Sequence, residues 1–199
     1  MRERVPWWGL ASSAAAPVLL IGGWTVAAEL QPGGFDSASD TISALAALDA
    51  RDRWVMTVAL AGLGVCHVST ALALRPLGGP GRLLLGAGGV ATVLVAAFPL
   101  PGDDGGSVPH TIAAAAAFAS LSAWPALAWR RRDGRGDTRG PAPARPVVAA
   151  GAAAVLLGLL GWFGAELALD DGRVGLAERV TAGAQALWPL VAVLASRRG

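Results

Sequence analysis

The stretch that decides the fold is Trp54–Leu74, which reads WVMTVALAGLGVCHVSTALAL and contains no charged side chain. A helix needs roughly 20 apolar residues to cross the hydrocarbon core of a bilayer. Charged residues stand directly before this stretch, at 51–53, and directly after it, at Arg75. A long apolar segment bounded by charge on both sides predicts a membrane-spanning helix.

The same pattern recurs along the whole chain. Hydrophobic residues make up 54% of the sequence and charged residues only 15%, whereas soluble domains carry about 25% charge. The sequence therefore predicts an all-α integral membrane protein, a single domain of residues 1–199 built as a bundle of six transmembrane helices. The predicted spans are 5–28, 54–74, 83–102, 109–129, 146–165 and 177–196.

The charges between the spans predict the orientation of the bundle. With the N-terminus inside, 12 of the 16 Arg residues and only three of the 14 acids lie in inner segments. Basic residues favour the cytoplasmic side of a membrane. We therefore expect a protein of the cell (plasma) membrane with both termini in the cytoplasm and the first span retained rather than cleaved. Residues 130–145, rich in Arg, Gly and Pro, are expected to form a flexible cytoplasmic linker.

The basic charge predicts contact with membrane lipids rather than with nucleic acid, because the Arg residues fall in loops between spans. Anionic head groups attract Arg near the membrane surface. A membrane-protein partner or a second copy of the chain is compatible with the same surface. Small residues recur within the spans, among them Gly64, Gly89 and Gly158, and they let helix backbones approach closely. We therefore expect a tight bundle with little internal cavity.

The first outer loop contains a segment suited to a short interfacial helix. Ser39 or Asp40 is a suitable N-cap for it. Ile42, Leu45 and Ala46 then form an apolar stripe at helical spacing. This segment is expected to lie on the bundle or on the membrane surface.

Polar residues that are candidates for a site gather on the predicted outer side. Candidate catalytic residues are His110, Asp104, Asp40 and Ser43, and candidate binding residues are Glu166, Glu178 and Arg179. Arg179 stands at the membrane edge, where an unpaired charge is unfavourable, so it is expected to pair with Glu166 or Asp40. His67 and Gln185 lie deeper in their spans, where we expect helix–helix hydrogen bonds.

Several short motifs resemble a known family. They are Asp40-Thr41-Ile42-Ser43-Ala44-Leu45, then Trp54 with Met56, Phe98-Pro99, a His that opens the fourth span, and Glu178-Arg179 ahead of Trp188. Together they resemble the bacterial membrane family catalogued as domain of unknown function 998. The resemblance covers nearly the whole chain and implies a six-helix membrane protein. It implies no reaction, cofactor or catalytic residue.

Three interpretations of the outer cluster remain open. A metal site would have only His110 as an outer imidazole ligand beside carboxylates, and no metal or other cofactor is predicted. A Ser–His–Asp hydrolase would use Ser43 or Ser39 with His110 and Asp104, although no Gly-x-Ser-x-Gly motif is present. In the structural interpretation, the acids are solvated and His110 caps a helix or bonds a backbone group.

The sequence therefore predicts a membrane protein that binds a lipid or a partner protein through its outer face, without a predicted enzymatic activity. Two alternatives are an outer-face enzyme of the hydrolase kind, acting on a lipid head group with His110 and nearby acids, and a small transporter. The enzyme requires His110, Asp104 and Asp40 around an open pocket. The transporter requires a polar path from the outer mouth to Gln185 and His67.

Overall fold

The computed structural model describes residues 4–102, 105–129, 141–169 and 172–198. Within these ranges the chain is helical and contains no strand. Its elements, in chain order, are α1 (Trp7–Glu29), η1 (Ala44–Ala46), α2 (Trp54–Ala73), α3 (Gly79–Ala97), α4 (Val108–Ala123), η2 (Trp124–Leu127), η3 (Ala142–Ala144), α5 (Pro146–Leu169) and α6 (Val174–Arg198).

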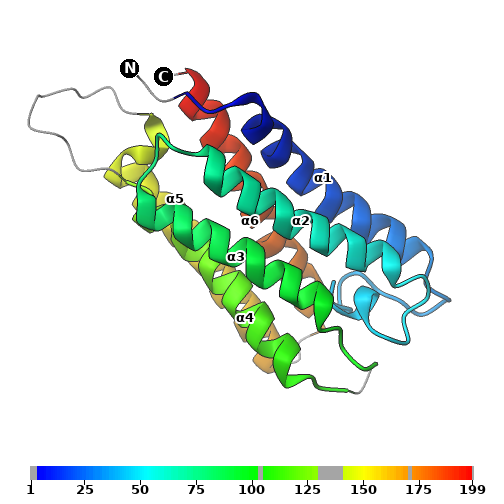
Figure 1. The fold of residues 1–199 in the computed structure, drawn as a ribbon. Helices are drawn as coiled ribbons and strands as arrows, with labels where there is room; N and C mark the ends of the chain where they lie inside the picture. Colours follow the sequence, from blue (N-terminus) through cyan, green and yellow to red (C-terminus); the bar gives the residue numbers. More distant parts are fainter. Residues whose placement is uncertain (1–3, 103–104, 130–140, 170–171, 199) are drawn as a thin grey trace, which may run out of the picture.

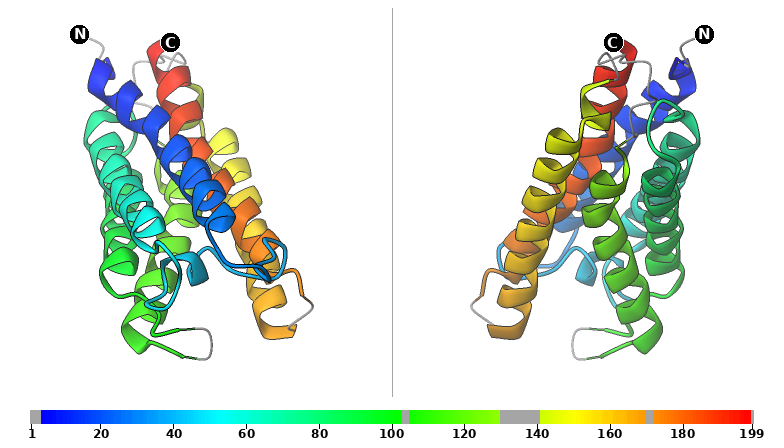
Figure 2. Two further views of the ribbon diagram at one scale, coloured as in Figure 1. Left: turned by 90° about the vertical axis from the view of Figure 1, so that its right-hand side faces the viewer. Right: turned by 90° about the vertical axis from the view of Figure 1, so that its left-hand side faces the viewer.

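The six α-helices form one bundle in which neighbours in the sequence are neighbours in space (Figure 1). Each helix packs on the next, and α6 returns to pack on α1, which closes the arrangement. Both chain termini lie at one end of the bundle (Figure 2). We call this end the terminal end. The opposite end, formed by residues 30–53, 98–102, 105–107 and 172–174, is called the distal end.

Four of the helices, α1, α2, α3 and α5, are long and apolar enough to cross a membrane. The surface of the bundle is apolar as well, with Val18, Leu83 and Val147 at least 70% exposed. A soluble protein rarely leaves a large continuous apolar surface in water. The outward-facing side chains are therefore of the kind that contacts lipid.

The remaining two long helices differ from those four. Helix α4 ends at Ala123, and the chain continues in the 3-10 turn η2 to Leu127. Helix α6 is long enough, but it contains buried Glu178, Arg179 and Gln185. These polar side chains lower its hydropathy while pointing away from the surface of the bundle, as buried polar residues in membrane helices do.

The first, second, fifth and sixth predicted spans match α1, α2, α5 and α6 to within four residues at each end. The fourth, 109–129, extends six residues beyond the end of α4, and the third was misplaced. Residues 83–102 were expected to be helical, whereas α3 runs from Gly79 to Ala97. It begins earlier because Pro80 suits the first turn of a helix, and Arg82 lies inside the helix with its side chain on the Ala71 carbonyl. It ends earlier because Pro99 disfavours the helical conformation of the residue before it.

The sequence predicted a short interfacial helix in the first outer loop, but the structure contains only the three-residue 3-10 turn η1 there. Asp40 does not cap a helix, because its carboxylate accepts a hydrogen bond from the Asp36 amide instead. The predicted apolar stripe is nevertheless buried, with Ile42, Leu45 and Ala46 in the core of the bundle. The segment thus packs on the bundle, which was one of its two expected positions, and not on a membrane surface.

Helices α2 and α3 approach so closely that glycine is required at their crossing. A Cβ atom on Gly64 would lie 2.5 Å from the Gly89 carbonyl oxygen, and one on Gly89 would lie 2.7 Å from the Gly64 oxygen. The prediction that small residues allow close helix approach is confirmed for this pair. Gly158, by contrast, is exposed on α5 and a Cβ there would meet no atom within 4 Å.

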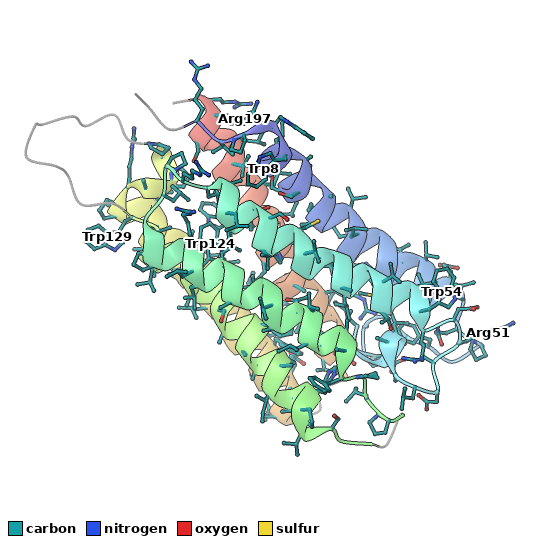
Figure 3. The ribbon with its side chains drawn as sticks, in the orientation of Figure 1. Trp8, Arg51, Trp54, Trp124, Trp129 and Arg197 are labelled. Atoms are coloured by element: carbon teal, nitrogen blue, oxygen red, sulfur yellow. The ribbon has the colours of Figure 1, made fainter. Side chains whose placement is uncertain are left out.

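The aromatic and basic side chains at the two ends fit a bundle placed across a bilayer. Trp54 and Arg51 lie at the distal end, whereas Trp8, Trp129 and Arg197 lie toward the terminal end (Figure 3). Trp side chains favour the two membrane–water interfaces. Most of the predicted linker falls on residues 130–140, outside the described ranges, but its last part forms the turn η3 with Ala144 buried.

Candidate functional site

The first distal connection, residues 30–53, is fixed to the start of α6 by backbone contacts. The Leu176 amide donates to the Ala38 carbonyl at 2.9 Å. The Ile42 amide donates to the Glu178 carboxylate at 2.6 Å. Glu178 is 4% exposed, so this predicted binding residue is used inside the molecule, where it holds the loop against α6.

Arg179 fastens the same loop through its guanidinium. Its Nη1 donates to the carbonyls of Ser37 at 2.8 Å, Asp40 at 2.6 Å and Gly175 at 3.1 Å. The group also lies 5.8 Å from the centre of the Phe35 ring, within the range of a cation–π contact. Arg179 is thus buried and bonded to main-chain oxygens, whereas the sequence predicted a pairing with a carboxylate.

The predicted partners of Arg179 were only partly right. Asp40 bonds it through its main-chain oxygen rather than through its carboxylate. Glu166 is not its partner, because it accepts a hydrogen bond from Trp162 Nε1 at 2.9 Å on its own helix. Sequence spacing could not distinguish these cases, since carbonyl oxygens are present at every position.

Two of the candidate catalytic residues meet at the distal end. His110 Nε2 lies 3.1 Å from the hydroxyl of Ser43, and His110 Nδ1 lies 2.9 Å from the carbonyl of Phe98. Ser107 caps α4 by accepting from the His110 amide, which fixes the backbone that carries the imidazole. Three segments far apart in the sequence therefore converge on one ring.

The tautomer of the neutral ring follows from its partners. A carbonyl oxygen can only accept a hydrogen bond, so Nδ1 of the neutral imidazole carries the hydrogen toward Phe98. Nε2 is then the acceptor, and the Ser43 hydroxyl donates to it. The predicted structural role of His110 and a nucleophile–base arrangement are both compatible with this geometry.

The other candidates do not join this pair in the described part of the chain. The Asp40 carboxylate is taken by the Asp36 amide, and the Ser39 hydroxyl bonds the Asp36 carbonyl. Asp104 lies outside the described residues. Among the described residues, no group of three or more His, Cys, Asp or Glu side chains is arranged to hold a metal ion.

A cavity of about 50 Å³ lies inside the bundle next to Ser43. Its wall is mostly apolar, with ten aliphatic or aromatic residues from the first distal connection and from helices α1, α2, α3, α4 and α6. Five polar residues complete it: Ser43, His67, Thr92, Glu178 and Gln185. The small volume is compatible with the predicted tight bundle with little internal cavity.

His67 is the most unusual group on this wall. It is 1% exposed, and neither ring nitrogen has a hydrogen-bond partner. Buried polar groups in folded proteins are nearly always bonded, and an exception calls for a missing water, ion or ligand. The sequence predicted a helix–helix bond for His67, which is wrong. For Gln185 it was right: its amide donates to the Phe118 carbonyl and to the Ser122 hydroxyl.

Sequence reasoning identified most of the polar residues here but not their grouping. Thr92 was missed, because a hydroxyl that bonds the preceding helical turn, as Thr92 does with Gly88, is common in membrane helices. His67 was noted as a polar residue in an apolar span. Its place beside Glu178 and Ser43 depends on how α2, α6 and the first distal connection pack.

Taken together, these features define an all-helical bundle with membrane-like helices and a partly polar cavity below one end. The chain belongs to the family described as Protein of unknown function (DUF998), whose model matches residues 13–195. No curated protein and no solved structure matches the chain.

Proposed function

We propose that this protein is a six-span integral membrane protein that binds a small, neutral, hydroxyl-bearing amphiphile in the cavity, with access from the distal end. The proposal rests on one observation: the buried His67 imidazole lines the cavity, and neither of its nitrogens has a hydrogen-bond partner among the described residues. Polar groups buried in a membrane bundle usually serve a site. A free donor and a free acceptor on one cavity wall need a ligand that supplies both.

The chemistry of the wall defines the class of ligand. A neutral imidazole offers one hydrogen-bond donor and one acceptor, and a hydroxyl group matches both. The apolar majority of the wall favours a hydrocarbon portion. Glu178 lines the cavity, and among the described residues no Arg does, which disfavours a carboxylate or phosphate.

The size of the cavity requires the roof to move. A volume of about 50 Å³ has room for only a few water molecules, at roughly 10–15 Å³ each. Ile42 and Ser43 belong to the wall and to the first distal connection, which Glu178 and Arg179 hold down. An amphiphile therefore fits only when the lining moves, and we expect the first distal connection to separate from α6.

The orientation of the bundle supports access from outside the cell. Both termini lie at one end (Figure 2), as an even number of crossings requires. Of the ten Arg residues in the described ranges, six belong to segments at that end, which favours the cytoplasmic side. The distal end would then face outward, in the cell membrane.

The cavity also bears on the transporter alternative, because Ser43, Glu178, Gln185 and His67 line one continuous space. This polar lining ends against an apolar cluster that includes Leu74, Leu85, Leu121, Trp124 and Val193. Leu121 belongs both to the cavity wall and to that cluster. A site that is closed toward the terminal end supports binding more than passage.

The test is nuclear magnetic resonance of the imidazole nitrogens in lipid nanodiscs, since the chain has only two His residues. We expect 1-octanol to shift the His67 signals saturably. Octane and octanoate, which share the chain but lack a neutral hydroxyl, serve as matched controls. Equal shifts with octane, or no shift with octanol, would contradict the proposal.

The variant His67→Phe gives a second readout. Replacing an unsatisfied buried polar group by an apolar ring of similar size is neutral or stabilising, so the midpoint of thermal unfolding should stay the same or rise. The stabilisation that octanol gives to the unmodified protein should disappear, because binding to the folded state is lost. A large loss of stability in His67→Phe without ligand would show that His67 is structural.

A further inference from the structure

We propose that Ser43 and His110 form a nucleophile–base pair that cleaves carboxylic esters at the roof of the cavity. The substrate class is a neutral ester with a short acyl chain. This inference rests on the proposed function in one respect, since the acyl chain would occupy the cavity described above. The chemistry itself depends on the pair alone.

The geometry of the pair meets the requirements of an activated serine. A nucleophile and its base must lie within hydrogen-bond reach, and a third group must orient the base. Ser43 Oγ lies 3.1 Å from His110 Nε2, and the Phe98 carbonyl lies 2.9 Å from Nδ1. The carbonyl fixes the tautomer in which Nε2 is free to take the serine proton.

The burial of the Ser43–His110 pair is compatible with access by a substrate. His110 is 6% exposed, which keeps the imidazole largely away from bulk water. Ser43 is half-buried and lines the cavity, and it directly precedes the turn η1. The nucleophile therefore stands between the distal surface and the apolar interior, with the cavity on one side.

The proposed reaction balances with water as the only co-reactant. Ser43 Oγ bonds to the ester carbonyl carbon while its proton passes to His110 Nε2. The bond to the alcohol oxygen then breaks, and the alcohol leaves with that proton. Water attacks the acyl group on Ser43, gives a proton to Nε2, and the carboxylic acid departs as the proton returns to Oγ.

The Phe98 carbonyl, which orients His110, determines how fast we expect ester hydrolysis to be. A carbonyl holds the imidazole in place as an aspartate does, but it carries only a partial charge with which to stabilise the imidazolium. We therefore expect slow turnover of simple esters and clear reaction with electrophiles that need only the activated hydroxyl. A general base contributes roughly 10²–10⁴-fold to such reactions.

The test is labelling of the full-length protein in nanodiscs with diisopropyl fluorophosphate. Ser43 Oγ would bond to phosphorus, fluoride would leave, and the proton would pass to His110. Peptide mass spectrometry should locate the label on Ser43. Ser43→Ala should abolish it, and Ser39→Ala, a change in the same connection, should leave the rate unchanged.

A second variant separates a catalytic base from a structural ring. His110→Gln keeps a side chain able to bond the Phe98 carbonyl and Ser43, but it cannot take a proton. We expect the labelling rate to fall at least about 100-fold, with the thermal midpoint preserved, and hydrolysis of p-nitrophenyl butyrate to fall in parallel. Absence of label on Ser43, or an unchanged rate in His110→Gln, would overturn the inference.

The two proposals fail separately. Diisopropyl fluorophosphate does not depend on the cavity for its reaction, so labelling of Ser43 without octanol binding would refute only the binding proposal. Octanol binding at His67 without labelling of Ser43 would refute only the catalytic one.

Discussion

Replacing Gly64 by valine should destabilise the protein far more than the same substitution at Gly158. A Cβ at this position would lie 2.5 Å from the Gly89 carbonyl oxygen and 2.9 Å from the Val93 amide nitrogen. Both are backbone atoms of α3, so the clash is relieved only by moving the helices apart. Overpacking of this kind destabilises proteins by about 3 kcal/mol at the upper end of its usual range.

The measurement is the midpoint of thermal unfolding in detergent or nanodiscs. A loss of about 3 kcal/mol corresponds to a fall of roughly 10 °C for a chain of this size. The matched control is Gly158→Val, where a Cβ meets no atom within 4 Å, and it should change the midpoint by about 2 °C or less. Equal midpoints for the two variants would show that α2 and α3 do not cross at Gly64.

The second large effect is expected from Arg179→Met, which preserves side-chain length and removes the guanidinium. Three carbonyls would lose their donor, two of them in the first distal connection, at Ser37 and Asp40. Hydrogen bonds to a charged group contribute about 1.5–3 kcal/mol each. Because bonds that share one donor are not additive, we expect a total loss of about 3 kcal/mol.

Hydrogen exchange read by mass spectrometry should show where stability is lost. Peptides covering residues 36–43 should exchange much faster in Arg179→Met, since the Ile42 and Leu176 amides both depend on the docked connection. The control is Arg173→Met, which removes one charge from an exposed position near the start of α6. Protection of residues 36–43 that is identical in the two variants would refute the fastening role of Arg179.

Much of the fold was readable from the sequence because apolar segments bounded by charge report directly on membrane-like helices. Trp54–Leu74 is the clearest case, and α2 occupies it almost completely. The rule failed at α3, where Arg82 was taken as a boundary. The Arg82 side chain reaches back to the end of α2 and bonds the Ala71 carbonyl, so the charge is accommodated within the helix.

The candidate site was readable only in part, for a different physical reason. Local sequence shows which side chains can donate, accept or transfer a proton, and His110, Ser43 and Glu178 were found in that way. Which of them meet depends on the order of helices in the bundle. The group that orients His110 is the carbonyl of Phe98. Because every residue has a backbone carbonyl, the sequence cannot show which one takes this role.

For His67 the sequence predicted a hydrogen-bond partner that the described part of the structure does not contain. A polar residue in an apolar span predicts a partner in a neighbouring helix, yet none of the described residues supplies one. The neighbouring Gly89 backbone lies so close to His67 that a Cβ on it would be 3.0 Å from the His67 Cβ. The ring is thus confined by α3 and left facing the cavity, an arrangement that depends on tertiary packing alone.

The proposed function requires that the partly polar cavity inside the bundle is reached from the distal end and that this end faces outward. Accessibility of single cysteines to a charged, membrane-impermeant methanethiosulfonate tests it most directly, because Cys66 is the chain's one cysteine and Cys66→Ala gives a cysteine-free background. Ala182→Cys would place a thiol on the cavity wall, and Ala186→Cys would place one a turn further along α6, in the core and off that wall. We predict that reagent outside intact cells modifies Ala182→Cys, that 1-octanol slows this reaction, and that Ala186→Cys stays unmodified. Modification of Ala182→Cys only from the cytoplasmic side, or at the same rate as Ala186→Cys, would contradict the account.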